Sequence, residues 1–209
     1  MQTLTEARSI GPAGIRFVVG DRNRDMAAAL ASAFADLVCV EVVCGDLLDA
    51  SPDCVVCPGN SFGDMGGGFD KVVDDLHGGN AQPVVARAIA EQYFGELPVG
   101  AGLLVEIPHA GVARLVVMAP TMRVPGAAPA LGAYLATRAA LVTMLRFRAM
   151  DERSPCTVAI PGMCTGVGGM SFAESASQMR AAFASVVEGR WREVAHPAMA
   201  PFALRDANR

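Results

Sequence analysis

At 209 residues and 21.7 kDa, the chain is long enough for a single domain that buries about 70 % of its unfolded surface. Its composition, 52 % hydrophobic and 18 % charged residues, is typical of a well-packed globular protein, and no apolar run approaches the roughly 18 to 20 residues of a membrane span. A net charge of -4 with scattered Lys and Arg argues against an extended nucleic-acid surface, which needs clustered cations.

The N-terminal segment 1–14 shows no pattern of strand or helix. It also lacks a basic region followed by an apolar core, so we expect no secretory signal, a flexible N-terminus and a cytoplasmic location. Residues 15–209 are predicted to form one domain, in which 190–209 make an irregular C-terminal tail. The oligomeric state is left open.

The first third of the domain predicts two strands separated by a helix. Residues 15–20 and 37–44 are rich in β-branched residues, and between them apolar residues recur every three or four positions over 24–36. Asp46 lies just past the second strand, where ligand-facing residues of α/β sheets are found. Equally, it can be a turn carboxylate that bonds its own backbone.

A continuously apolar segment, 53–57, predicts a central strand covered on both faces. A glycine-rich loop follows, carrying Asn60 and ending on Asp70. Helices are predicted at 69–76 and 83–94, and two paired strands at 101–107 and 114–119 on either side of a turn at 109–111.

The last third predicts a long helix at 127–150, a strand at 156–160, a second glycine-rich loop at 161–170 and a helix from 171 to 187. The apolar face of the long helix is expected to be Leu131, Leu135, Leu141 or Val142, and Leu145. Ser171 and Glu174 have the spacing of a capping box. The alternation of strands and helices indicates an α/β layer sandwich, with both glycine-rich loops at the same end of the sheet.

The cysteines and histidines do not indicate a metal site. Cys54 and Cys57 have C-x-x-C spacing but lie along a strand, and the three histidines, His77, His109 and His196, are not paired at ligand spacing. We therefore expect the six cysteines to be reduced and structural. Cys164 is a weak candidate nucleophile, since no histidine stands near it in the sequence.

The two glycine-rich loops predict an anion site. Each joins a strand to the N-terminus of a helix, where backbone N–H groups and the helix dipole favour negative charge, and two facing loops suit a diphosphate. The sequence has no G-x-x-x-x-G-K-[ST] motif and no G-x-G-x-x-G after its first strand. Walker-type and Rossmann-type sites are therefore disfavoured.

Three motifs resemble the macro domain family, whose members bind ADP-ribose. The family's first loop runs through Asn-Ala-Ala-Asn into a glycine cluster and Val-Asp, and here Cys57-Pro-Gly-Asn60 precedes Gly66-Gly-Gly-Phe-Asp70. The second family loop, Ser-Thr-Gly-Val-aromatic-Gly, is similar to Cys164-Thr-Gly-Val-Gly-Gly169. The turn Gly45-Asp46-Leu47 is similar to the family's Gly-Asp-Ile turn.

The resemblance implies a three-layer α/β/α macro-type domain with a mixed, mostly parallel sheet of about six strands and antiparallel edge strands. It also implies that Asp46 binds adenine, that the second loop wraps the diphosphate, and that Asn60 bonds the distal ribose. In mono-ADP-ribosyl hydrolases of the family, an Asp ten residues after this Asn helps to activate or position a water, and Asp70 has that spacing. The alternatives are that Asp70 caps the following helix and that Asn60 satisfies loop backbone.

The resemblance implies binding of ADP-ribose or a derivative, with hydrolysis of ADP-ribose esters (mono-ADP-ribosyl or O-acetyl-ADP-ribose), and no cofactor or metal. A non-catalytic reader of ADP-ribosylated macromolecules is the alternative. Two departures bear on substrate positioning: Gly168 stands where many hydrolases carry the aromatic residue, and Asp74 stands where a His is often found. The candidate catalytic residues are Asn60 and Asp70, and the candidate ligand-binding residues are Asp46, Leu47, Gly59, Ser61, Gly66, Gly67, Gly68, Phe69, Gly162, Cys164, Thr165, Gly166, Val167, Gly168, Gly169 and Met170.

Overall fold

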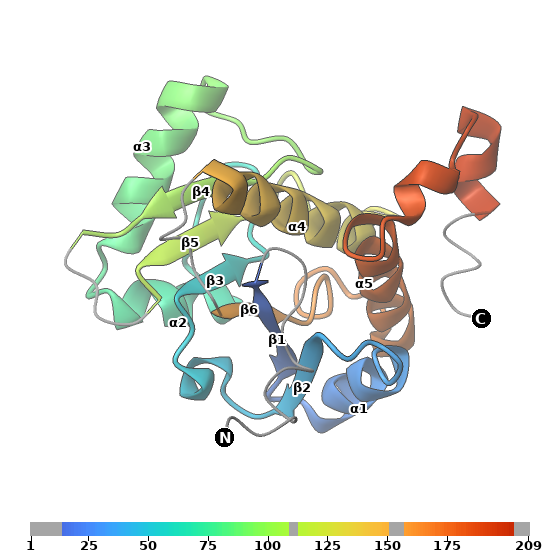
Figure 1. The fold of residues 1–209 in the computed structure, drawn as a ribbon. Coiled ribbons are helices and arrows are strands. Elements are labelled where there is room, and N and C mark those ends of the chain that lie inside the picture. Colours follow the sequence, from blue (N-terminus) through green and yellow to red (C-terminus); the bar gives the residue numbers. More distant parts are fainter. Residues whose placement is uncertain (1–13, 109–112, 151–156, 203–209) are drawn as a thin grey trace.

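A computed structural model describes residues 14–108, 113–150 and 157–202 (Figure 1). Of the expected flexible segment 1–14, residues 1–13 lie outside the described residues, as does the expected turn at 109–111. The elements are β1 Arg16–Asp21, α1 Arg24–Ala33, β2 Val40–Cys44, the 3-10 helix η3 Leu47–Ala50, β3 Cys54–Cys57, α2 Gly68–Leu76, α3 Ala81–Tyr93, β4 Leu103–Glu106, β5 Leu115–Met118, α4 Gly132–Met150, β6 Thr157–Pro161, α5 Phe172–Val186 and the 3-10 helices η4 Arg190–Glu193 and η5 Pro197–Met199.

Six strands form one mixed, mostly parallel sheet in the order β2-β1-β6-β3-β5-β4. All neighbouring strands are parallel except β4 and β5. The expected number of strands and the expected combination of parallel and antiparallel pairs are thus confirmed. The expectation that both edges are antiparallel is wrong, because β2 runs parallel to β1 at one edge. Helix α1 provides the crossover that a parallel pair requires.

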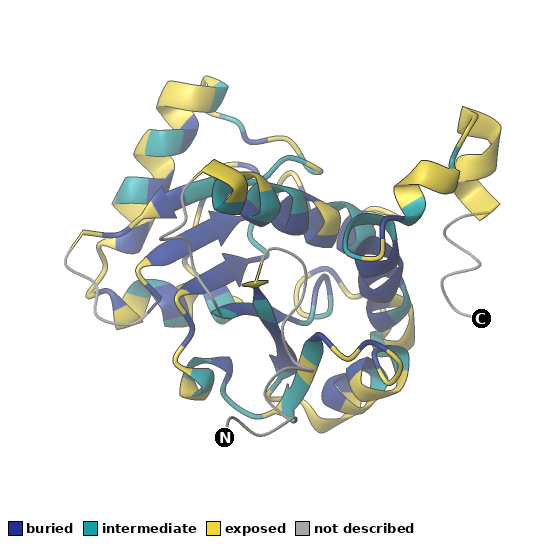
Figure 2. Ribbon diagram, in the orientation of Figure 1, coloured by how far each residue is buried: buried dark blue, intermediate teal, exposed yellow. Residues whose placement is uncertain are grey.

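Helices cover both faces of the sheet, so the three-layer architecture is confirmed (Figures 1 and 2). Helices α1, α4 and α5 pack on one face around Phe17 and Phe183, whereas α2 and α3 pack on the other around Val55 and Ile89. Figure 2 shows the inner strands of the sheet mostly dark blue between these layers, whereas the edge strands β2 and β4 are partly exposed. The continuously apolar β3 is central because every one of its side chains meets a covered face.

Strand alternation separates the C-x-x-C cysteines. Cys54 belongs to the core on the α1, α4 and α5 side, and Cys57 belongs to the core on the α2 and α3 side. The two thiols therefore cannot share one metal ion or one disulfide. The cysteines at 39, 44, 54, 57 and 164 are free thiols, as expected; Cys156 lies outside the described residues.

Two predicted boundaries are wrong by several residues. The long helix begins at Gly132 rather than at 127, because Pro125 and Pro129 interrupt this stretch and the Ala128 N–H bonds the Gly168 carbonyl at 3.0 Å. Strand β2 begins at Val40 rather than at 37. The three residues before it make turns that continue from α1, with Leu37 N–H bonded to the Phe34 carbonyl.

The apolar face predicted for the long helix is only partly right: Leu141 is fully buried in the core. Leu131 precedes α4 and is exposed, and Leu135 and Leu145 are only partly buried. The buried face is made mainly of small residues, with Ala133, Ala136, Ala139 and Ala140 among them. Helix α4 packs against α5, and small side chains at a helix contact let the two axes approach closely. No helix in the described part of the chain has the length and apolarity to cross a membrane.

Candidate functional site

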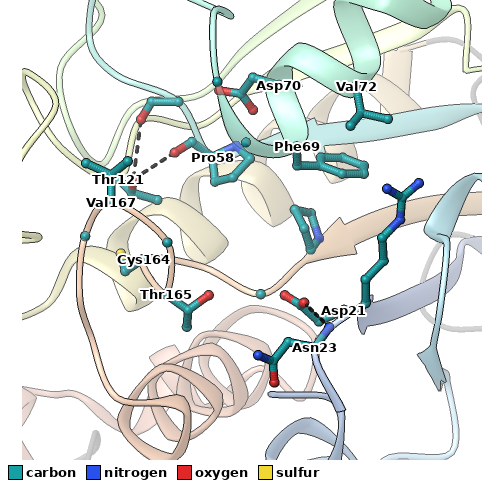
Figure 3. A pocket seen from close by; sticks show the side chains of 18 of the residues that line it. Asp21, Asn23, Pro58, Phe69, Asp70, Val72, Thr121, Cys164, Thr165 and Val167 are labelled. Carbon is teal, nitrogen blue, oxygen red and sulfur yellow. Dashed lines mark hydrogen bonds between the residues drawn. The ribbon is translucent and has the colours of Figure 1, made fainter. Parts of the chain in front are cut away.

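One cavity of about 740 Å³ opens where the parallel strands end (Figure 3). Its lining comes from the carboxyl ends of strands and the segments that follow them, at β1 (20–23), β2 (45–47), β3 (58–72), β5 (121–125) and β6 (161–172). Parallel strands place their carboxyl ends at one edge of a sheet, where ligands of α/β proteins bind. The volume is in the range of about 300 to 1,000 Å³ that holds small ligands.

The structure brings most of the predicted site residues together. The cavity is lined by Asp46, Leu47, Gly59, Asn60, Gly66, Gly67, Gly68, Phe69, Asp70, Gly162, Cys164, Thr165, Gly166, Val167 and Gly168. Ser61, Gly169 and Met170 do not line it. Ser61 is buried, while the Gly169 and Met170 N–H groups turn back to the Gly166 and Cys164 carbonyls.

The first glycine-rich loop delivers the N-terminus of α2 to the cavity. The N-cap is Gly67, which has no side chain that could accept hydrogen bonds from the N–H groups of the first turn. Those groups have no intrahelical acceptor and lie at the positive end of the helix dipole. Gly59 leaves room beside them: a Cβ there would stand 2.5 Å from Asp70 Oδ2 and 2.8 Å from Met118 Cε, so these side-chain ends would have to shift.

Asp70 lies in the first turn of α2 and is buried at the cavity wall. Its Oδ1 has no hydrogen-bond partner in the described part of the chain, and the N-cap is Gly67, so Asp70 does not cap the helix. Burial raises its pKa to about 7; the Cys57 thiol opposes this shift and the charge of Asp64 adds to it. The carboxyl therefore titrates near neutral pH.

The Asn60 side chain bonds the backbone of its own loop. Its Oδ1 accepts from the Phe62 N–H at 3.0 Å and from the Asp64 N–H at 3.4 Å, and its Nδ2 donates to the Asp64 carbonyl at 3.3 Å. The alternative that Asn60 satisfies loop backbone is thus confirmed. Asn60 also lines the cavity, and one hydrogen of its amide remains available to a ligand.

The second glycine-rich loop presents consecutive N–H groups. Those of Thr165, Gly166, Val167 and Gly168 donate to no acceptor in the described ranges. In Figure 3, Cys164 and Thr165 lie across the cavity from Phe69 and Asp70. The two strand-to-helix loops therefore face one another with unpaired donors between them, an arrangement that binds anions.

The conformation of this loop excludes a side chain at Gly168. A Cβ there would stand 2.5 Å from the Cys164 carbonyl oxygen, which is backbone and cannot move aside freely. The loop has no place for an aromatic ring at this position. Burial raises the pKa of the neighbouring Cys164 thiol to about 11, so the thiol is protonated at neutral pH and a poor nucleophile.

Asp46 lies at the other end of the lining, as the N-cap of η3. Its Oδ1 accepts from the Leu48 N–H at 3.0 Å, so the alternative of a turn carboxylate bonding its own backbone is confirmed. Its Oδ2 pairs with the Arg22 guanidinium. The Leu48 hydrogen bond and then the Arg22 contact lower the pKa of Asp46.

Several lining residues were not identified from the sequence. Residues 20–23 line the cavity after β1 just as 45–47 do after β2, and their position directly after a predicted strand is the signal that indicates them. Thr121 and Met122 join the site because the segment after β5 runs beside the first loop, where Thr121 Oγ1 donates to the Pro58 carbonyl at 2.7 Å (Figure 3).

No protein-family model matches the sequence. An uncharacterized protein of Aeropyrum pernix is 36 % identical over 149 residues, which cover 70 % of this chain and 71 % of the relative. An uncharacterized protein of Aquifex aeolicus is 37 % identical over 135 residues, covering 63 % of this chain and 72 % of the relative.

Solved structures share the fold at low identity. The macrodomain of Mycobacterium tuberculosis DarG matches with a TM-score of 0.56 and 18 % identity, over 68 % of this chain and 88 % of that one. Thermosipho africanus DarTG in complex with ADP-ribose matches with a TM-score of 0.51 and 15 % identity, over 77 % and 48 % of the two chains. A mutant Oceanobacillus iheyensis macrodomain with ADPR matches with a TM-score of 0.52 and 16 % identity, over 65 % of this chain and 71 % of that one. The chain therefore belongs to one family with the Aeropyrum pernix and Aquifex aeolicus proteins, and its fold is that of the macro domain family.

Proposed function

We propose that the cavity binds ADP-ribose or a close derivative. The observation that carries this proposal is the pair of facing loops, in which the first turn of α2 and residues 165–168 offer unpaired backbone N–H groups to one cavity. Such donors neutralise a diphosphate without lysines. Solved structures of this fold with ADP-ribose, at low identity, support the choice of ligand.

The cavity lining offers a distinct set of groups for each part of the ligand. Asp46 lies after β2 and would accept from the adenine amino group, while Asn60 and Asp70, after β3, would face the distal ribose. The diphosphate would lie between the two glycine-rich loops. Ser61, Gly169 and Met170 have no direct part in this arrangement, because they do not line the cavity.

We propose further that the site hydrolyses ADP-ribose esters and that Asp70 is catalytic. A buried carboxyl with a pKa of about 7 takes a proton from an attacking water efficiently at neutral pH. Its negative charge also stabilises the positive charge that develops at an anomeric carbon. Gly59 permits this geometry, because any larger residue would collide with the carboxylate. The remaining Asn60 amide hydrogen would orient the ribose.

The test is release of ADP-ribose from a mono-ADP-ribosylated protein, measured by chromatography. We expect release by the unmodified protein and a loss of about 10²- to 10⁴-fold in Asp70→Ala, with ADP-ribose binding retained in calorimetry. The matched control is Asp75→Ala, because Asp75 lies on the same helix but is exposed and paired with Lys71. Equal release by Asp70→Ala and the unmodified protein would refute a catalytic Asp70.

A non-catalytic reader is the second candidate function. Two observations favour it: the Asn60 amide is largely engaged by loop backbone, and the loop at Gly168 cannot carry an aromatic wall for the distal ribose. Binding of ADP-ribose without release from any ester between pH 6 and 8 would support the reader. No heat of binding at millimolar ADP-ribose would exclude both functions, since even weak binding registers at that concentration.

A further inference from the structure

The cavity contains an ion pair between Arg22 and Asp46. It lies apart from the residues proposed to bind the diphosphate and the distal ribose. Among the residues that the structure describes, Arg22 is the single cationic side chain in the lining, which also holds the carboxylates of Asp21, Asp46, Asp64 and Asp70. Arg22 comes from the connection between β1 and α1, and Asp46 comes from the connection after β2. These two connections are neighbours, because β1 and β2 pair up to their carboxyl ends, where Asp21 is opposite Cys44.

The backbone on both sides of the pair is fixed. The Gly45 N–H bonds the Asp21 carbonyl at 3.1 Å, which ties the two connections together. The Asn23 N–H bonds Asp21 Oδ1 at 2.8 Å, and Asn23 Oδ1 caps α1 by accepting from the Asp25 and Met26 N–H groups. Arg22 is thus held between a strand end and a capped helix, and its side chain reaches Asp46.

Both partners keep hydrogen-bonding capacity. A carboxylate has about four acceptor positions, and Asp46 uses one for Leu48 and one for Arg22. A guanidinium has about five N–H donors, and Arg22 uses one of them on Asp46. The pair therefore offers a hydrogen-bond acceptor and a donor side by side. The hydrogen bond from the Leu48 N–H fixes the orientation of the Asp46 carboxylate.

We propose that Arg22 determines base specificity, forming with Asp46 a donor–acceptor pair that binds the edge of a 6-aminopurine. This inference rests on the proposed binding of ADP-ribose. Adenine presents an amino donor next to a ring-nitrogen acceptor, so Asp46 accepts from the amino group and Arg22 donates to the ring nitrogen. A 6-oxopurine places an oxygen against the carboxylate instead, and two acceptors then face each other unpaired.

The test compares ADP-ribose with inosine diphosphate ribose, which differs at the 6-position of the purine, by calorimetry. For the unmodified protein we expect ADP-ribose to bind at least about tenfold more tightly. In Arg22→Ala we expect the affinity for ADP-ribose to fall about tenfold and the affinity for the inosine analogue to change little. The ratio of the two dissociation constants then approaches one. Arg22→Lys keeps a cation without the planar fork and should restore part of the ratio.

The matched control is Arg24→Ala, because Arg24 is an exposed arginine two residues away that does not line the cavity. We expect it to keep the full ratio, and thermal unfolding verifies that each variant is folded. An unchanged ratio in Arg22→Ala overturns the inference while leaving ADP-ribose binding intact. Tighter ADP-ribose binding by Arg22→Ala also overturns it, since Arg22 would then compete for Asp46. No binding of either ligand by the unmodified protein overturns the proposed function itself.

Discussion

Asp70 has a carboxyl group whose charged form is disfavoured by burial. Its pKa of about 7 in the folded state lies above the roughly 3.9 of an unfolded chain. Between these two values the folded state binds more protons than the unfolded state, so the free energy of unfolding falls as pH rises through this window. Because the side chain is almost fully buried, the cost above pH 7 amounts to about 4 kcal/mol.

Asp70→Asn tests this linkage, because an amide does not titrate. We expect the unmodified protein to be more stable at pH 5 than at pH 8, and the difference to shrink by about 2 to 3 kcal/mol in the variant. Urea unfolding at both pH values measures it. Asp75→Asn serves as the control, since Asp75 is exposed on the same helix. A pH difference that is the same in all three proteins would show that Asp70 does not titrate in this range.

At the residue scale, motif and spacing predict the identity of the site residues but not their bonding. The interval from Asn60 to Asp70 identifies both, and both line the cavity. The engagement of Asn60 by the backbone of Phe62 and Asp64 depends on a loop conformation that spacing does not encode. Arg22 was not identified because its partner, Asp46, is close only after β1 and β2 pair.

The second glycine-rich loop is an element of fixed shape, and Gly168→Ala tests this. The new Cβ would stand 2.5 Å from the Cys164 carbonyl oxygen and 3.0 Å from the Ala128 Cβ. Relief requires movement of the loop backbone, so we expect a loss of about 1 to 3 kcal/mol in stability and weaker ADP-ribose binding. Gly166→Ala is the control for stability, because a Cβ at Gly166 meets nothing within 4 Å.

Urea unfolding and calorimetry on both variants measure the two effects. Equal stability of Gly168→Ala and Gly166→Ala would mean that the loop accommodates a side chain, and the absence of an aromatic ring at 168 would then need another explanation. Neither glycine has a positive φ, so the comparison isolates the contact from backbone strain.

At the element scale, local patterns predict the strands well and the long helix poorly. Strand β3 was identified because a run of apolar residues suffices for a strand covered on both faces. Of the buried face of α4 the leucine pattern predicts only Leu141, because it overlooks Ala136 and Ala140, which are buried where α4 meets α5. The start of α4 was missed because Ala128 bonds a distant loop, a contact absent from local sequence.

At the scale of the whole molecule, the order of strands determines which connections meet. Strand β1 lies between β2 and β6, and this position brings residues 20–23 to the cavity beside the second glycine-rich loop. Nothing in the local pattern of β1 specifies its neighbours in the sheet. The resemblance to macro domains predicts the layers and the mixed sheet, whereas the parallel edge follows from the β1–α1–β2 unit of this chain.

The C-terminal tail is predicted to be dispensable for the site. Within the described part of the chain, the last residue that lines the cavity is Phe172, and most of residues 191–202 are exposed. In Figure 1 this segment lies beyond α5, away from the sheet. Its main packing is that of η4 against α5, where Trp191 and Val194 border a smaller hollow with Tyr134. We therefore propose that residues 15–189 form the complete binding domain.

Deletion of residues 190–209 should leave the Kd for ADP-ribose within about twofold, and it should lower the Tm by only a few degrees, because little apolar area is lost. A shorter deletion of 195–209, which keeps η4, separates the packing of that helix from the rest of the tail and should leave the Tm nearly unchanged. Calorimetry and thermal unfolding measure both quantities. If the longer deletion abolished binding while the protein stayed folded, the tail would form part of the ligand site, and the domain would have to extend beyond residue 189.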